Sequence, residues 1–248
     1  MSEIKTQIKQ SNAIIKGIDA IAEKVVVKSG KIKQKAIDKA IKINGTKPAF
    51  SAASLVQADI DNNLRAVIND VNQDFTNFVK ATSTYLANNY AIKLTAIDLD
   101  VISKKNSVII DSLVANTEVL KSDIQGMLTQ NLGAGISEKQ LVQELQDLYP
   151  AYASNAGTIL NTGTGRLFID INVSKFKKQD FKWYLWAGPD DAITRARPCK
   201  HWVWHKFAAK DLATITATRM TLWNCRHSII PIPEEEIDNY PTGDLKFA

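Results

Sequence analysis

The sequence has few of the residue types that support metal or redox chemistry, and they are gathered in one segment. Among 248 residues there are two cysteines, three histidines and five tryptophans, and all of them lie between Trp183 and Pro233. Two cysteines do not make a disulfide framework, which argues against a disulfide-stapled secreted domain. The segment 183–233 is therefore where a functional site is expected.

Long hydrophobic runs and helix-breaking residues are also scarce. No run of about 18 apolar residues occurs, so we expect no membrane span. The N-terminal stretch MSEIKTQIKQ lacks the apolar region of a secretory signal, which predicts a protein made and kept in a cytosol, or packaged from one. Between residues 46 and 125 there is no glycine, and proline occurs only at Pro48. Little in this stretch would interrupt long helices.

Positive charge is concentrated at the N-terminus. The net charge of the chain is +5, yet residues 1–49 alone carry 11 lysines against four acidic residues. A basic arm of this kind could meet the phosphates of packaged DNA or an acidic protein surface. It could equally be an ordinary solvated helix face rich in lysine.

The basic arm also has the apolar spacing of an amphipathic helix. Positions at alternating intervals of four and three form a heptad seam with one polar interruption: Ile4, Ile8, Ser11, Ile15, Ile18, Ala22 and Val25. Ser29-Gly30 predicts a break in this helix, after which a helical spacing resumes as far as Asn44-Gly45. A single narrow stripe cannot fold alone, so we expect it to pack on another helix of this chain or of a partner.

The middle of the chain predicts a helical hairpin or bundle. Apolar residues recur at helical spacing from Ser54 to about residue 132, and four aspartates among them are expected to form a solvated face: Asp59, Asp61, Asp70 and Asp74. A capping box at Ser137 and Gln140 predicts one more helix, which Pro150 would end. The Gly- and Thr-rich segment 155–168 is expected to be a turn.

The composition changes after that turn. From Arg166 the pattern favours strands, and FKWYLWAG in particular is typical of a half-buried strand. The sequence therefore predicts a mainly α N-terminal part followed by a small α+β domain. The expected divisions are a basic helical arm (1–48), a helical region (49–150) and a C-terminal module (151–248).

Two Cys-x-His pairs stand out in the aromatic segment. On an extended backbone, Cys199 and His201 would point to one side, and so would Cys225 and His227. Together they would supply the Cys₂His₂ set that tetrahedral zinc favours, with His205 as a substitute ligand. The same cysteines could instead be buried reduced thiols or could form one disulfide outside the cell.

The residues around the first pair also have a structural interpretation. After the turn at Gly188-Pro189, an Asp–Arg ion pair and a threonine cap would pin a loop, and the residues concerned are Asp191, Thr194, Arg195 and Arg197. The tryptophans are most simply the core of this module. Neither observation predicts a catalytic residue.

The order of these motifs resembles a known family. Asp191-x-x-Thr194-Arg195, then Pro198-Cys199, a spacer and Trp223-x-Cys225-Arg226-His227-Ser228 are similar to the C-terminal domain of the phage Mu F-like head morphogenesis family. Two further segments come before these motifs in the order that the family uses. They are the predicted helix that begins at Gly135-Ile136-Ser137 and the segment 161–164, so the resemblance covers roughly residues 130–233. It implies a non-enzymatic minor head protein near the portal vertex of a virion, assembled in a host cytoplasm.

Two other functions compete with this interpretation. His227-x-x-x-Pro231 faintly resembles the catalytic strand of ββα-metal nucleases, although no histidine follows it. A DNA-binding virion protein that uses the basic arm is the third hypothesis. The head protein is the function that the sequence favours.

Overall fold

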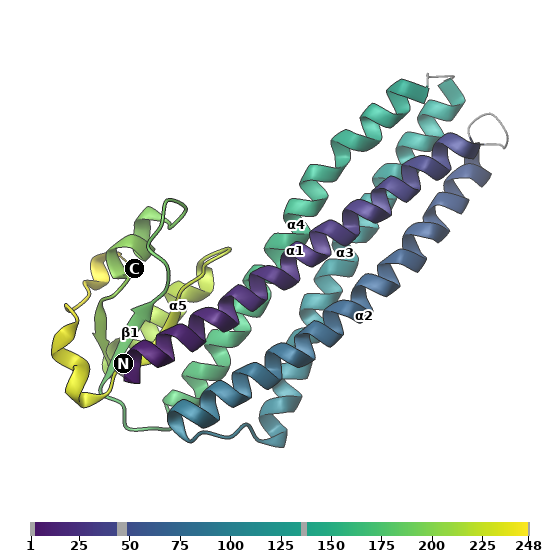
Figure 1. Ribbon diagram of the computed structural model, residues 1–248. Coiled ribbons are helices and arrows are strands. Elements are labelled where there is room, and N and C mark those ends of the chain that lie inside the picture. The colour runs from purple at the N-terminus through teal and green to yellow at the C-terminus, as the bar shows by residue number, and fades with distance from the viewer. Residues whose placement is uncertain (1–2, 44–48, 135–137, 248) are drawn as a thin grey trace. The chain divides into compact units, whose positions relative to one another are not determined.

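The computed structural model describes residues 3–43, 49–134 and 138–247, and the described chain is mostly helical as far as Phe176 (Figure 1). Four long helices follow one another: α1 (Glu3–Ile43), α2 (Ala49–Tyr90), α3 (Ala96–Ala134) and α4 (Glu138–Phe176). A small sheet and a short helix come after them. The predicted fold class, a mainly α part followed by a small α+β part, is confirmed. No helix among the described residues combines the length and apolar composition needed to cross a membrane.

The C-terminal part is organised around a three-stranded antiparallel sheet of order β2-β1-β3. Its strands are β1 (Trp183–Ala187), β2 (Lys206–Ala208) and β3 (Ser228–Pro231), with α5 (Leu212–Thr221) between β2 and β3. Short helical segments lie at Ala196–Lys200, Ala209–Asp211, Glu234–Asn239 and Leu245–Phe247. The aromatic run that predicted a strand forms β1, which is central because both neighbours pair with it.

The contacts of the chain divide it into two compact units that combine distant segments. One consists of Met1–Asp19, Asn77–Asn106 and Asn161–Ala248, and the other of Ala20–Thr76 and Ser107–Leu160. We call them the sheet unit and the helical unit. Their boundaries differ from the expected divisions at 48 and 150, because each of the four long helices contributes residues to both units.

The helical unit is held by aliphatic burial and by pairs between lysine and aspartate. Lys24 Nζ lies 2.7 Å from a carboxylate oxygen of Asp74, and Lys39 lies 2.6 Å from Asp59. Further pairs join Lys28 to Asp70 and Lys121 to Asp61. The four aspartates expected on a solvated face are thus all paired, and three of them neutralise part of the basic arm.

In the sheet unit, the first turns of α1 complete the core of the module. Ile4 is fully buried in one cluster with Leu185 of β1 and Ile230 of β3. Ser11, the polar interruption of the heptad seam, is also buried, and its hydroxyl donates to Ser228 Oγ over 2.8 Å. Apart from the partly buried Ile8, the seam is therefore buried, but its first part packs on the sheet as well as on helices.

Several predicted breaks do not occur. α1 continues through Ser29-Gly30, and α4 continues through Pro150, the Gly- and Thr-rich segment and the predicted strand after Arg166. Proline inside a helix costs about 3 kcal/mol. Here apolar side chains after the proline are buried, namely Tyr152, Ala156, Leu160 and Leu167, and this burial offsets the cost. The predicted cap residue Ser137 lies outside the described residues.

Candidate metal centre

Three of the predicted metal ligands meet beside the sheet. Cys199 lies in the helical segment Ala196–Lys200, whereas Cys225 and His227 lie in the extended loop between α5 and β3. Cys199 and His227 are buried and Cys225 is partly buried. One ligand atom from each residue lies within 4.8 Å of the other two. This group could hold a metal ion.

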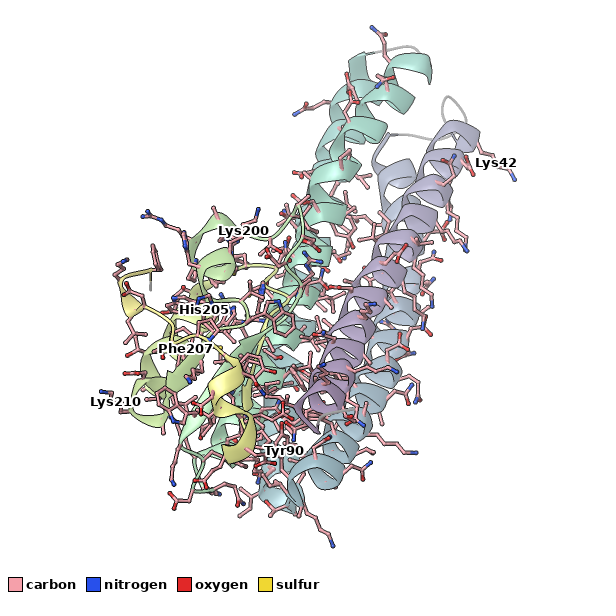
Figure 2. All side chains as sticks on the ribbon, turned by 60° about the vertical axis from the view of Figure 1, so that its left-hand side comes forward. Lys42, Tyr90, Lys200, His205, Phe207 and Lys210 are labelled. Carbon is pink, nitrogen blue, oxygen red and sulfur yellow. The ribbon has the colours of Figure 1, made fainter. Side chains whose placement is uncertain are left out.

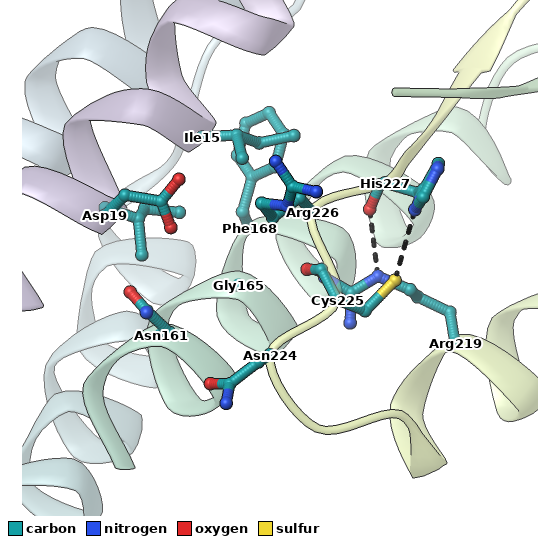
Figure 3. A pocket seen from close by; sticks show the side chains of 11 residues that line it. Ile15, Asp19, Asn161, Gly165, Phe168, Arg219, Asn224, Cys225, Arg226 and His227 are labelled. Carbon is teal, nitrogen blue, oxygen red and sulfur yellow. Dashed lines mark hydrogen bonds between the residues drawn. The ribbon is translucent and has the colours of Figure 1, made fainter. Parts of the chain in front are cut away.

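The spacing of the three atoms suits a single ion. The two Sγ atoms are 3.9 Å apart, and Cys225 Sγ is 3.6 Å from Nδ1 of His227 (Figure 3). Ligands at about 2.0–2.3 Å from a tetrahedral ion are separated from one another by roughly 3.5–3.8 Å. Two of the three separations are therefore already close to those of a tetrahedral site, and both cysteines are free thiols.

The ring of His227 is oriented by its other nitrogen. Nε2 lies 2.9 Å from the carbonyl oxygen of Pro189, and a carbonyl only accepts hydrogen bonds. Nε2 of the neutral ring therefore carries the hydrogen, and the free lone pair of Nδ1 faces the Cys225 sulfur. Metal-ligating histidines are commonly held in this way by a backbone carbonyl.

Gly188 makes room for that ring. A Cβ atom at Gly188 would lie 2.5 Å from Cδ2 of His227 and 3.0 Å from Cα of His227. Only a residue without a side chain lets β1 and the loop before β3 approach so closely. The ring of His227 also stacks on that of Trp186 at a centroid distance of 6.0 Å.

A buried arginine holds the loop that carries two of the ligands. Arg219 of α5 is 2% exposed, and it donates from Nε to the His227 carbonyl (2.9 Å) and from Nη2 to the Cys225 carbonyl (2.6 Å; Figure 3). The guanidinium approaches α4 at Gly165, where a Cβ would lie 3.2 Å from Nη2. Sequence patterns do not point to Arg219, because a single arginine at helical spacing gives no sign that it is buried.

The electrostatics of the two thiols follow from this arrangement. The hydrogen bond from the Cys199 thiol lowers the pKa of Cys225, burial opposes this shift, and the positive charge of Arg219 adds to it. The same hydrogen bond and then burial raise the pKa of Cys199. Of the two thiols, Cys225 is therefore the one that ionises more readily, and the thiolate is the form that binds metals.

The loop after β1 is pinned next to the thiols. The Thr194 hydroxyl donates to the Asp191 carboxylate over 2.9 Å, and Asp191 pairs with Arg226 at 2.7 Å. The hydrogen bond from Arg226 is the main cause that lowers the pKa of Asp191 to about 2. Arg195 donates to the Trp223 carbonyl over 3.1 Å. The predicted Asp–Arg pair exists, but its arginine comes from the second motif.

The remaining predicted residues lie elsewhere. His201 is exposed and stacks on Phe247 at 3.9 Å, and Arg197 lies 5.5 Å from the same ring. Nδ1 of His205, just before β2, is 3.0 Å from the Val203 carbonyl oxygen (Figure 2). The predicted Cys₂His₂ set is therefore not assembled.

Backbone conformation explains why only one Cys-x-His pair converges. Cys225 and His227 lie in the loop that leads into β3, and their Sγ and Nδ1 atoms, 3.6 Å apart, lie on the same side of it. Cys199 and His201 lie in consecutive helical turns, where residues two apart point in nearly opposite directions.

A cavity adjoins the three ligands. It has a volume of about 360 Å³ and is lined by Cys199, Cys225 and His227 together with Arg195 and the exposed Trp223. A small molecule or a side chain from outside could therefore reach the ligand group. Comparisons of the chain with protein-family models, with curated proteins and with solved structures find no match.

Proposed function

We propose that this chain is a minor head protein of a tailed phage, with the structural role that the phage Mu F-like resemblance implies. It docks on the portal or on capsid proteins, and it assists head assembly and genome packaging or delivery. Its place is the virion, after assembly in the host cytoplasm. The proposal assigns it no catalytic residue and no membrane.

One observation supports this proposal most directly. The motif residues that carry the resemblance come from two stretches about 30 positions apart, and they bind one another pairwise. Asp191 pairs with Arg226, Arg195 bonds to the Trp223 carbonyl, and Cys199 meets Cys225. Motif members that contact one another in this way are typical of a structural module.

We further propose that the module is held together by a structural zinc ion. Two thiols and one imidazole are soft ligands of the type that zinc selects, and His227 already has the hydrogen bond that orients a ligand. Cys199, Cys225 and His227 would hold the ion. A fourth ligand would come from water or from a group that enters the adjoining cavity.

Purified phage particles test the head-protein proposal. We expect the chain to sediment with DNA-filled heads and with their portal, and to stay with the heads when tails are removed. Particles assembled without it should contain fewer packaged genomes. Its absence from purified heads would overturn the proposal.

A nicking assay separates this function from a nuclease. With supercoiled plasmid and Mg²⁺ or Mn²⁺, we expect no cleavage above that of the His227→Ala variant. Robust cleavage that His227→Ala abolishes would favour the ββα-metal nuclease.

The basic arm has fewer free charges for DNA than its composition suggests, because Lys24, Lys28 and Lys39 are paired with aspartates.

A further inference from the structure

A groove of about 860 Å³ lies within the sheet unit, apart from the metal ligands. One wall is a face of α1 between Lys5 and Asp19. The other is formed by loops of the module that carry Pro189, Trp204 and Tyr240. Because the two walls come from segments far apart in the sequence, the helical periodicity of α1 alone does not predict this groove.

The floor of the groove is apolar and rests on the core. Ile8 and Tyr240 line it, and both pack against the buried cluster that contains Ile4. The indole of Trp204 is 37% exposed. Its backbone has a φ of 62°, a conformation that costs a bulky residue about 1 kcal/mol or more, and its N–H donates to the Trp186 carbonyl over 2.9 Å. The fold thus keeps a large aromatic side chain at the surface of the groove.

The rim of the groove carries three lysines of the arm that have no ion pair among the described residues. Lys5, Lys9 and Lys16 all line the groove and are exposed. They are separated by four and seven residues, so they lie on one side of α1 over about 16 Å. Among the described residues none of the three has an ion pair, whereas Lys24 and Lys39 of the same helix are paired with aspartates.

We propose that this groove binds an acidic, amphipathic segment of a partner protein. Apolar side chains of the segment would lie on Ile8, Trp204 and Tyr240, and its carboxylates would pair with the three lysines. The carboxylate of Asp19 also lines the groove and would repel a continuous phosphate backbone, whereas Asp191 is paired there with Arg226. Mixed charge above an apolar floor therefore favours a peptide over a nucleic acid.

Fluorescence anisotropy with the full chain tests the groove. The probe is a labelled synthetic helix of roughly 14 residues with leucines at i, i+3, i+4 and i+7 and glutamates beside them. A second probe has lysine in place of each glutamate. We expect the acidic probe to bind and the basic probe to bind at least about tenfold more weakly, with affinity falling as salt rises.

Two matched triple variants locate the binding. Lys5→Glu/Lys9→Glu/Lys16→Glu should weaken the acidic probe by about tenfold or more. The control Lys178→Glu/Lys200→Glu/Lys210→Glu, which changes exposed lysines outside the groove, should change affinity by less than about twofold. Lys200 and Lys210 of this control point outward from the module (Figure 2). Trp204→Ala should weaken binding while leaving its salt dependence nearly unchanged.

Three results would overturn the proposal. They are equal losses in the two triple variants, equal binding of the acidic and basic probes, and tighter binding of a labelled single strand, a DNA duplex or anionic vesicles than of the acidic helix. The inference rests on the proposed head protein for its setting. Retained sedimentation with heads in the Lys5/Lys9/Lys16 variant would reject the groove alone, whereas absence of the unchanged chain from heads rejects the head protein.

Discussion

The two units of the molecule are stabilised by different chemistry. In the helical unit, buried aliphatic side chains and surface Lys–Asp pairs recur along the helices, and each contact involves few partners. In the sheet unit, one buried arginine, two thiols and one imidazole share neighbours within a few ångströms. A change in the helical unit should therefore have local, additive effects. A change at the thiols should disturb several contacts at once.

Removal of a ligand should have the largest effect. We expect the wild-type chain to contain about one zinc ion, and we expect Cys225→Ser to lose it. At a free metal concentration of about 1,000 times Kd, bound metal contributes about 4 kcal/mol to the free energy of unfolding. Elemental analysis and thermal unfolding with and without chelator measure both quantities.

His201→Ala is the matched control for the ligand variant, because this histidine stacks on Phe247 away from the thiols. It should keep the metal. A metal-free wild-type chain with unchanged stability would reject the zinc proposal and leave two reduced thiols.

Arg219→Met should have the next largest effect. It removes two hydrogen bonds and leaves the buried carbonyl groups of residues 225 and 227 without these donors. We expect a loss of about 2–4 kcal/mol in the free energy of unfolding, measured by denaturant titration. Arg65→Met, at an exposed position of α2, should change it by less than about 0.5 kcal/mol. Similar losses in the two variants would contradict the coupling inferred for the sheet unit.

Leu120→Ala tests whether a change in the helical unit has only a local effect. Leu120 of α3 is buried in the helical unit, so its truncation should cost about 2–4 kcal/mol through lost burial and the cavity left behind. The metal content should not change. The neighbouring Val119 is 61% exposed, and Val119→Ala should cost less than about 0.5 kcal/mol. Loss of metal in Leu120→Ala would show that the units are coupled.

The smallest effect is expected from the pH dependence of Asp191. Its pKa is lowered to about 2 in the folded chain, mainly by the hydrogen bond from Arg226, so the ionised form stabilises the fold. This contribution is complete at neutral pH, begins to fall below the usual carboxyl pKa of about 4, and is lost as the pH falls through about 2. The stability difference between wild type and Asp191→Asn should therefore shrink between about pH 5 and pH 2. A difference that grows on acidification would contradict the assignment.

Local patterns in the sequence were sufficient for much of the fold. The heptad seam of α1 is buried between Ile4 and Val25 except at the partly buried Ile8, and the aromatic run forms β1. The pattern failed at Pro150 because sequence rules give the cost of a proline without the burial of the residues that follow it in α4. The predicted strand after Arg166 failed for the same reason, since α4 buries that segment as a helix.

The candidate site could be predicted only in part. The ligand types and three of the four positions follow from the two Cys-x-His pairs. His201 was predicted wrongly as a ligand position because the Cys-x-His spacing does not reveal whether the backbone is helical or extended. Arg219 and Gly188 depend on neighbours distant in the sequence, and no local pattern contains that information.

The hydrogen bond between Ser11 and Ser228 has a consequence for how the chain folds. Its two residues are 217 positions apart, and Ile4 meets the sheet over a similar separation. Contacts of such long range slow folding, because a large loop must close before they form. On a ribosome, the first turns of α1 would wait with an apolar face uncovered until nearly the whole sequence had been translated. A nascent chain of this kind needs protection from premature association, so its yield should depend on chaperones more than its helical content suggests.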